Sequence, residues 1–381
     1  MTPPKVEDSR LTLAGWVLVL NAGSSSLKWV VLNADTEGVE QQGQSSWEGV
    51  EANRHATELA TALARAPSVH AVGHRVVHGG MRFREAVRVD EAVRDEIAQL
   101  AELAPLHNPA AVAGIDAARA RFPGVPQVAA FDTAFHASMP QATALYPLPW
   151  EWTTRWGLRR FGFHGLSVSY AIGRARELLA GTPQRVVVCH LGAGCSVTAV
   201  GDGRSVSTSM GFTPLEGVMM AQRSGSVDPG LLLYLMTRHG MGPEELERGL
   251  NERSGLLGVS GVSTDLRQVL AAADAGHERA RLARDMFVER IVSCVGAMLA
   301  TLGGLDALVF TAGIGEHSAV VRDAVCRAFG YVGLRLDQAA NAASPADRDI
   351  SLPESAVRVL VIAAREDLAI LRQVKQVLGW S

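Results

Sequence analysis

The sequence predicts an α/β protein with two similar halves, and three observations lead to this. Short runs of valine, isoleucine and leucine recur at strand length, at Val17–Leu20, Val186–Cys189, Leu308–Phe310 and Val357–Ile362. Amphipathic helical patterns such as Asp90–Leu103 lie between them. A strand followed by a small glycine-containing turn occurs near the start of the chain and again near its middle. Strands that alternate with helices are typical of the α/β class.

The long apolar tract Met286–Leu302 is predicted to be a buried helix. Its apolar residues at i, i+4 spacing are Phe287, Ile291, Val295 and Leu299. The tract contains Glu289 and Arg290 and is followed by two glycines, which end a helix well. These charges argue against a membrane span.

Composition limits the possible functions. A chain of 381 residues exceeds the size at which one core usually stops growing, so two domains are expected. A net charge of −3 means that the chain has no excess of positive charge to bind a polyanion. We therefore expect neither nucleic acid nor a membrane as a partner. The four cysteines lack paired spacing, and the first fifteen residues lack a secretory signal. We therefore expect core cysteines and a cytoplasmic location.

An internal repeat predicts that the fold is duplicated. The segments VLVLNAGSSSLKWVV from Val17 and VVVCHLGAGCSVTAV from Val186 share one scheme. Each has an apolar strand, one polar residue (Asn21 or His190), a small turn and a second apolar strand. A third segment, ALVFTAGIGEHSAVV from Ala307, keeps the strand and turn but continues towards a helix. We expect two half-domains that face a cleft.

The first turn is predicted to bind phosphate. Small residues let backbone N–H groups approach a phosphate, and Ser24 and Ser26 add hydroxyl donors, with Lys28 just beyond. The sequence does not match GxxxxGK[ST], which excludes a P-loop NTPase on motif grounds.

Several polar residues occupy positions that an apolar core would not favour. Arg75, inside the apolar strand VGHRVVHGG, needs an anionic partner. His74 and His78 have a spacing that suits zinc on a helix, but a strand separates them, so metal binding there is not favoured. Asp132 follows a strand and His164 lies between glycines.

The stretch Thr208–Gly230 has neither helical nor strand periodicity, and it contains Arg223. Irregular segments of this length are usually functional or disordered, and its methionines and phenylalanine argue against disorder. Two arginines, a phosphate-binding turn and a carboxylate, without a nucleophile–base pair, favour phosphoryl transfer.

From about Trp16 to Leu378 the chain resembles the acetate kinase family, within the superfamily of acetate and sugar kinases, heat-shock chaperones and actin. The matching blocks are NAGSSSLK, GHRVVHGG, LAPLHNP, FDTAFH, FGFHG, HLGAG, TSMGFTPLEG, RSGSVDP, SGLLGVSGVSTDLR, FTAGIGE and REDL. The resemblance implies a duplicated actin-like ATPase (RNase H-like) fold, with two domains around a central cleft. It places residues 1–132 and 368–381 in the N-terminal domain and 133–367 in the C-terminal, nucleotide-binding domain. It also implies ATP and acetate as substrates, acetyl phosphate and ADP as products, Mg²⁺ or Mn²⁺, and a homodimer.

The resemblance also assigns roles to residues. Arg75 and Arg223 would bind acetate and neutralise the transferring phosphoryl group, and His164 would hydrogen-bond that group in the transition state. Asp132 with Glu366 would hold and orient the metal site. A carboxylate substrate is already ionised at neutral pH and needs no general base, so Asp132 is interpreted as a metal-site residue.

The implied binding residues lie in both halves of the chain. Those for the nucleotide are Asn21, Ser24, Ser26, Lys28, His190, Gly192, Gly194, Asp265, Arg267, Gly313, Ile314, Gly315 and His317. Asn21 is also assigned to the metal. The wall around the acyl group is Val77, Leu106, Phe163 and Pro214.

Some positions depart from the family pattern. Ala193 and His317 each replace an asparagine near the nucleotide, Leu166 and Val168 replace threonine and histidine, and Ser226 replaces aspartate. We expect effects on efficiency and nucleotide preference rather than on the reaction.

Two other functions fit the same motifs. One is a kinase for propionate or another short carboxylate, although Val77 is bulky enough to favour acetate. A single methylene changes binding by only about 1–3 kcal/mol, so propionate would be a lesser substrate. The other is a weakly active nucleotide-binding relative.

Overall fold

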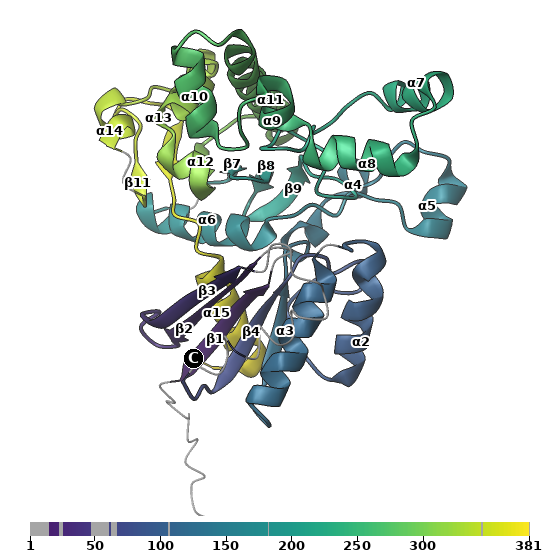
Figure 1. Ribbon diagram of the computed structural model, residues 1–381. Helices are drawn as coiled ribbons and strands as arrows, with labels where there is room; N and C mark the ends of the chain where they lie inside the picture. The colour runs from purple at the N-terminus through teal and green to yellow at the C-terminus, as the bar shows by residue number, and fades with distance from the viewer. Residues whose placement is uncertain are drawn as a thin grey trace, which may run out of the picture. The chain divides into compact units, whose positions relative to one another are not determined.

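The computed structural model describes residues 15–22, 26–46, 61, 67–105, 107–181, 183–343 and 346–380. These residues form two compact units (Figure 1). The first consists of residues 1–76, 86–130 and 367–381, and the second of residues 77–85 and 131–366. Residues 77–85, 131 and 132, which the sequence-based boundaries place in the N-terminal domain, group with the second unit.

The first unit contains a six-stranded sheet in the order β3-β2-β1-β4-β6-β5. Its strands are β1 (Trp16–Ala22), β2 (Ser26–Asn33), β3 (Val39–Ser46), β4 (Ala71–Val76), β5 (Val87–Arg88) and β6 (Gln127–Phe131). The central strand β1 pairs antiparallel with β2 and parallel with β4. The edge strand β5 is antiparallel to β6.

The second unit repeats this sheet. Its strands are β7 (Arg185–Leu191), β8 (Cys195–Gly201), β9 (Arg204–Thr208), β10 (Ala307–Thr311), β11 (Arg348–Asp349) and β12 (Arg358–Val361). The order is β11-β12-β10-β7-β8-β9, so both sheets read 3-2-1-4-6-5 when numbered from their own first strand. Asn21 and His190 are each the next-to-last residue of the central strand. The predicted duplicated fold is confirmed.

Helices cover both faces of the first sheet. They include α2 (Glu91–Gln99), α3 (Asn108–Arg121) and α15 (Glu366–Leu378). Leu18 and Leu20 belong to the same apolar cluster as residues of α3. Because neighbouring residues of a strand face opposite sides, Val19 and Gly73 point to the other face. There α15 packs so closely that a Cβ on Gly73 would lie 2.5 Å from Ile370 Cγ2.

The predicted helix Asp90–Leu103 is divided in the structure. α2 ends at Gln99, and a 3₁₀ turn covers Leu100–Glu102. Of the four apolar residues on the predicted face, only Ile97 is buried. This helix packs on the unit through Ile97 and is also joined to α3 by the ion pairs Arg94–Asp116 and Glu91–Arg119.

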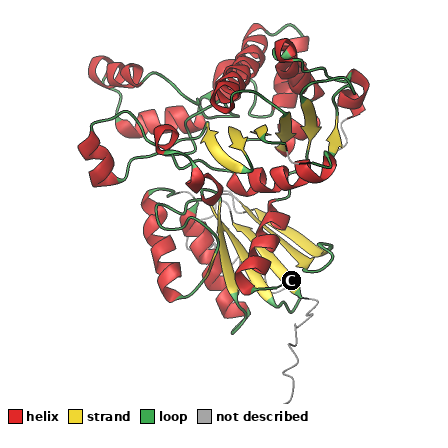
Figure 2. Ribbon diagram, turned by 180° about the vertical axis from the view of Figure 1, so that it is seen from behind, coloured by secondary structure: helices red, strands yellow, loops and turns green. Residues whose placement is uncertain are grey.

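Most of the helices described belong to the second unit (Figure 2). They are α4 (Gln141–Ala144), α5 (Trp150–Trp156), α6 (Gly165–Leu178), α7 (Pro229–His239), α8 (Pro243–Glu252), α9 (Gly255–Ser260), α10 (Leu266–Asp274), α11 (Glu278–Leu302), α12 (Ala312–His317), α13 (Ala319–Arg327) and α14 (Gln338–Ala343). Figure 1 shows α11 over one face of the sheet and α6 across the other.

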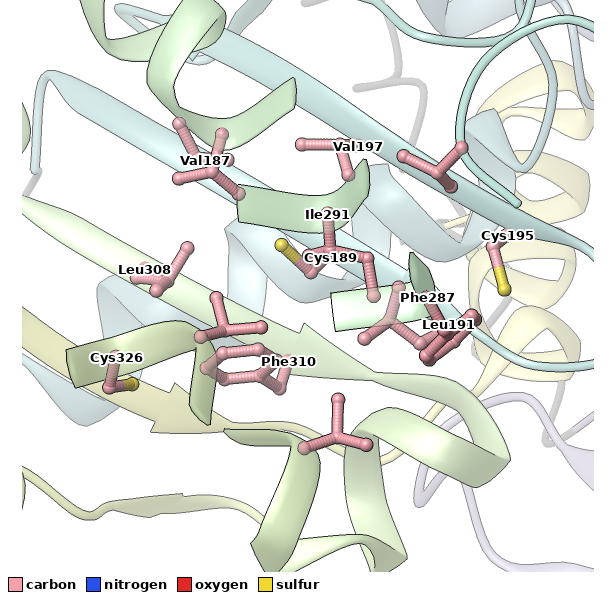
Figure 3. Close-up of a cluster of buried hydrophobic side chains, with 14 of the residues drawn as sticks. Val187, Cys189, Leu191, Cys195, Val197, Phe287, Ile291, Leu308, Phe310 and Cys326 are labelled. Carbon is pink, nitrogen blue, oxygen red and sulfur yellow. The ribbon is translucent and has the colours of Figure 1, made fainter. Parts of the chain in front are cut away.

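The core of the second unit forms where α11 packs on the sheet (Figure 3). Phe287 and Ile291 contribute fully buried side chains from α11, as predicted, and α11 ends at Gly303 in the left-handed conformation. Cys189, Cys195 and Cys326 are buried in this core as predicted, whereas Cys294 is half-buried. Burial raises the pKa of the Cys195 thiol to about 12, which keeps it protonated. Among the described helices, none is long and apolar enough to cross a membrane.

Candidate active site

The turn between β7 and β8 forms the centre of the candidate site in the second unit. Gly192 N donates a hydrogen bond to Gly194 O at 3.1 Å, and Ala193 between them is exposed. A Cβ on Gly194 would lie 3.4 Å from His164 Nε2 and 3.6 Å from Arg223 Nη1. The absent side chain at position 194 therefore leaves room where an imidazole, a guanidinium and the backbone of the turn meet.

Two histidines stack beside this turn. The rings of His164 and His190 have centroids 4.0 Å apart and an interplanar angle of 18°. His164 Nδ1 lies 2.9 Å from Ser196 Oγ, and His190 Nδ1 lies 2.9 Å from Ser167 Oγ. The Nδ1 atom of His164 is hydrogen-bonded to Ser196, and the opposite edge of the ring, with Nε2, faces Gly194. The sequence reasoning missed both serines, because no spacing links them to their histidines.

His164 owes its position to an uncommon backbone conformation. Its φ of +60° is left-handed, and it is the residue immediately before α6. Gly165 N donates a hydrogen bond to Asp132 O at 2.9 Å, and a Cβ on Gly165 would lie 2.3 Å from that oxygen. Asp132, which directly follows β6 and is 1% exposed, is thus fixed next to the start of α6.

Arg223 reaches the site from the irregular segment predicted to be functional. No helix or strand occurs between the end of β9 and the start of α7, both within the described residues. Arg223 Nη1 donates a hydrogen bond to Pro214 O at 3.2 Å, and burial lowers the pKa of Arg223. Ala221 N donates to Ala193 O at 3.2 Å, which ties the segment to the turn.

Val77 and Phe163, two of the predicted acyl-wall residues, are both neighbours of His78. Val77 is half-buried and next to His78 in sequence, and the His78 ring meets Phe163 edge-on at 5.5 Å. Gly80 N donates a hydrogen bond to His78 Nδ1 at 2.9 Å, and burial lowers the pKa of His78 to about 4. His78 is therefore a neutral packing residue. Leu106 lies outside the described residues.

In the first unit the structure brings Arg75 and Asn21 together. Arg75 Nη1 donates a hydrogen bond to Asn21 Oδ1 at 3.3 Å, between the neighbouring strands β4 and β1. Lys28 on β2 is exposed and stands opposite Asn21 in the strand register. Ser24 and the side chain of Ser26 lie outside the described residues, so the phosphate-binding turn stays a prediction.

His74, the partner of His78 in the rejected metal pair, is a structural residue. Its Nε2 lies 2.7 Å from Gln127 Oε1, and burial lowers its pKa to about 4. The two histidines belong to different units.

The glycines predicted to contact adenosine lie on α12. This helix contains Gly313, Ile314, Gly315 and His317, and it directly follows β10 as the repeat predicted. Fully buried Arg322 of α13 donates to Gly315 O at 2.8 Å, to Glu316 O at 2.7 Å and to Asn341 Oδ1 at 2.8 Å. Sequence reasoning missed this arginine, which holds the carboxyl end of α12 in place.

Asp265 and Arg267 bind each other. Asp265 Oδ1 accepts hydrogen bonds from Arg267 N at 2.9 Å and Arg267 Nε at 3.0 Å, and these bonds lower the pKa of Asp265. The pair begins α10, and the Arg267 side chain is 90% exposed. The described contacts of Asp265 therefore cap a helix, and its role near adenosine stays a prediction.

Comparison with known proteins supports one family. A sequence model described as the Acetokinase family matches residues 38–372. The chain belongs to the acetokinase family. An acetate kinase from Nostoc sp. is 45% identical to this chain, and the match covers 94% of this chain and 98% of the Nostoc protein.

Solved structures agree with the family. The crystal structure of Porphyromonas gingivalis acetate kinase matches this chain with a TM-score of 0.87 at 36% identity, over 96% of this chain and 100% of the other. A propionate kinase from Francisella tularensis matches with a TM-score of 0.85 at 36% identity, over 94% and 98%. The resemblance stated from the sequence and the actin-like ATPase fold are confirmed.

A buried histidine beneath the site predicts a pH dependence of stability. His136 Nδ1 lies 2.9 Å from Ser205 Oγ and its Nε2 lies 2.9 Å from Phe163 O, and burial lowers its pKa from 6.5 to about 4. The unfolded chain takes up this proton first as the pH falls. The part of the unfolding free energy that comes from neutral His136 is therefore fully present above pH 6.5. It is lost as the pH falls from 6.5 to 4, by about 3 kcal/mol in total.

We expect His136→Gln to reduce the slope of unfolding free energy against pH in this window, as measured by denaturant titration from pH 4 to 7.5. The slope will not vanish, because His74 and His78 also have lowered pKa values. Identical slopes for the variant and the wild-type protein would contradict the assignment.

Proposed function

We propose that the chain is an acetate kinase that reversibly transfers the γ-phosphoryl group of ATP to acetate, giving acetyl phosphate and ADP. The observation that carries this is the meeting of His164 Nε2, the Arg223 guanidinium and the Gly192–Gly194 turn around one point. A cation, an imidazole edge and a glycine turn are groups that bind a phosphoryl group in transfer. The family and its relatives named acetate kinase support the substrate.

Electrostatic repulsion between acetate and the γ-phosphate is the main obstacle to this reaction. Arg223 is largely removed from water, so its positive charge is less screened than a surface arginine would be. It offsets the repulsion as the two anions approach, with Arg75 of the first unit as the second cation. His164 stabilises the equatorial oxygens of the transferring group through a hydrogen bond.

Metal binding is part of this proposal. Magnesium prefers oxygen ligands and is usually held by one or two carboxylates together with substrate phosphates. Among the described residues no group of three or more His, Cys, Asp or Glu could hold a metal. The carboxylates of Asp132 and Glu366, with Asn21, would hold Mg²⁺ or Mn²⁺. The bound metal would neutralise charge on the nucleotide phosphates.

The nucleotide would use the second unit. The N–H groups of the Gly192–Gly194 turn and His190 would contact phosphates, and α12 with Asp265 and Arg267 would border the adenosine. Ala193 is exposed, so the departure from asparagine at this position removes a donor without changing the packing. Lys28, Ser24 and Ser26 would contact phosphate from the first unit.

We also propose that the chain forms a homodimer through α7. The eleven residues of α7 include none that is buried, and Leu231, Leu233, Tyr234 and Met236 are exposed on it. The nearby helix α5 exposes Trp150, Trp152 and Trp156. Figure 1 shows both helices extending from the same side of the second unit. An apolar surface of this kind marks an interface, and a second copy of the chain is its simplest partner.

The location proposed is the cytoplasm. All four cysteines are free thiols, which suits a reducing compartment.

The reaction is tested by measuring acetyl phosphate and ADP formed from Mg-ATP with and without acetate. We expect ADP to depend on acetate, and Arg223→Ala to lower turnover by about 10³–10⁵ because an arginine on a transferring phosphoryl group supplies that factor. Arg327→Ala, which removes an exposed arginine on α13, is the matched control and should leave turnover unchanged. Normal turnover in Arg223→Ala would rule out this role.

Propionate is the second candidate substrate, since one structural neighbour is named a propionate kinase. We expect Val77→Ala to raise the kcat/KM ratio of propionate over acetate by roughly tenfold, because one methylene in a pocket is worth about 1–3 kcal/mol. The KM for ATP should not change. A constant ratio would place Val77 away from the acyl group.

The proposed dimer is tested by introducing negatively charged residues on the exposed face of α7. Leu233→Glu combined with Met236→Glu should convert a particle of twice the chain mass into one of the chain mass, as measured by light scattering after gel filtration. Val320→Glu, on the exposed face of α13, is the control. A dimer that persists in the double variant would show that α7 is not the interface.

A further inference from the structure

We infer that Tyr146, Glu216 and Arg160 form a brace that positions Pro214 and Arg223 for the reaction. None of these three residues was a candidate from the sequence. The inference rests on the proposed function, because the role of Arg223 comes from it. The three side chains are positioning residues that act through the segment 209–226.

This segment needs support from side chains. It contains no helix or strand among its described residues, so no regular backbone ladder determines its shape. Some of its backbone groups bond within the segment, for example Ser226 N to Gly217 O at 2.8 Å and Met220 N to Arg223 O at 3.1 Å. These bonds lie in its second half. In the first half Gly211 N donates to Thr213 O at 3.3 Å and Gly211 O accepts a hydrogen bond from Phe161 N at 3.0 Å, and the brace adds side-chain contacts on either side of Pro214.

Glu216 stands at the centre of the brace. Its Oε2 accepts a hydrogen bond from the Tyr146 hydroxyl, and its Oε1 accepts one from Arg160 Nη2 at 2.5 Å. The Tyr146 oxygen in turn accepts a hydrogen bond from Phe212 N at 2.8 Å. The segment is therefore attached to Tyr146 at two positions, 212 and 216, on either side of Pro214.

Arg160 extends the brace to the start of the segment. Its Nη1 donates to the carbonyl oxygens of three successive residues, Thr208, Ser209 and Met210, at 3.2, 2.9 and 3.1 Å. Its guanidinium lies 5.4 Å from the centre of the Tyr146 ring, and its own backbone N donates to Ala144 O at 2.6 Å. One arginine thus connects the end of β9, the carboxylate of Glu216 and the chain beside Tyr146.

The brace is tightly packed and partly shielded from water. The side chains of Arg160 and Glu216 are 17% and 32% exposed. A Cβ on Gly211 would lie 1.7 Å from Glu216 Oε2 and 2.1 Å from the Tyr146 hydroxyl oxygen, so a larger residue at position 211 would displace the Tyr146–Glu216 contact. Burial and the hydrogen bond to Glu216 raise the pKa of Tyr146, which keeps its hydroxyl a donor throughout the physiological range.

The brace reaches the site through one carbonyl group. Pro214 lies between the two attached positions, and its carbonyl oxygen accepts the hydrogen bond from Arg223 Nη1 at 3.2 Å. If Glu216 loses its hydrogen bonds, the Pro214 carbonyl group shifts and the Arg223 guanidinium loses the acceptor that holds it in position. Because Pro214 is also a proposed acyl-wall residue, the loss should affect acetate more than ATP.

The test uses Tyr146→Phe, which removes the hydroxyl and keeps the ring, and Glu216→Gln, which keeps the shape and removes the charge. We expect each to lower kcat/KM for acetate by roughly ten- to a hundredfold, since a misplacement of about 1 Å in a reacting group costs up to 10²-fold. The KM for ATP should stay constant. Thr143→Val is the matched control, because its hydroxyl bonds Val206 O on β9 at 2.8 Å and does not contact the segment.

A double-mutant cycle shows whether the brace acts through Arg223. In an Arg223→Ala background Tyr146→Phe should cause no further loss, because the group it positions is gone. If the double variant loses kcat/KM for acetate by the product of the two single-variant factors, the inference is overturned. Equal losses in kcat/KM for acetate and in ATP affinity, which indicate a general structural role, would also overturn it.

Hydrogen exchange supplies a readout that needs no activity. Tyr146→Phe should speed amide exchange at Phe212 and Gly217 and leave the amides of β7 and β8 unchanged. If exchange is faster in Tyr146→Phe but the wild-type protein makes no acetyl phosphate, the brace is supported and the proposed function is rejected. Unchanged exchange and unchanged kcat/KM for acetate in an active protein would reject the brace alone.

Discussion

The antiparallel pairing of β7 with β8 is the interaction on which the second unit depends. It places His190 opposite Ser196 and makes the Gly192–Gly194 turn the point where the chain reverses. On its other side β7 pairs with β10, which sets Thr311 beside His190 and starts α12 at the same end of the sheet. The backbone ladder thus brings both proposed nucleotide elements to one edge before any side chain contributes.

Two kinds of support therefore meet at the site. His190 and the turn are held by strand pairing, which is cooperative and rarely opens, and His164 is fixed at the start of α6. Arg223 is held by a segment without helix or strand, and such segments open at lower free energy than strands do. The group proposed to neutralise the phosphoryl charge is therefore the one held by irregular chain rather than by a strand. That arrangement suits a site whose charge distribution changes during the reaction.

Local patterns were enough to predict much of the fold. Strand-length apolar runs, the repeated turn and the i, i+4 spacing of Phe287 and Ile291 reflect the backbone periods of 2 and 3.6 residues. The serines that hold His164 and His190 could not be found in this way, because they are ordinary polar residues far away in sequence. The brace was missed for the same reason. Tyr146 and Glu216 are 70 residues apart, and only the folded chain makes them neighbours.

Sequence resemblance predicted candidate residues but not their partners. It pointed to Asp265 and Arg267 without showing that they bind each other. It also could not indicate that α7 would lack buried residues, because the pattern of Pro229–His239 is as apolar as that of a core helix.

The return of α15 to the first unit has a consequence for synthesis of the chain. The first sheet is made early, yet the helix that packs on Gly73 and covers one face comes after residues 131–366. A ribosome therefore releases nearly the whole second unit while Val19 and its neighbours on that face still lack their cover. Domains usually fold in the order in which they are made. In this chain the later unit can complete its core before the earlier unit receives the helix that covers one face of its sheet.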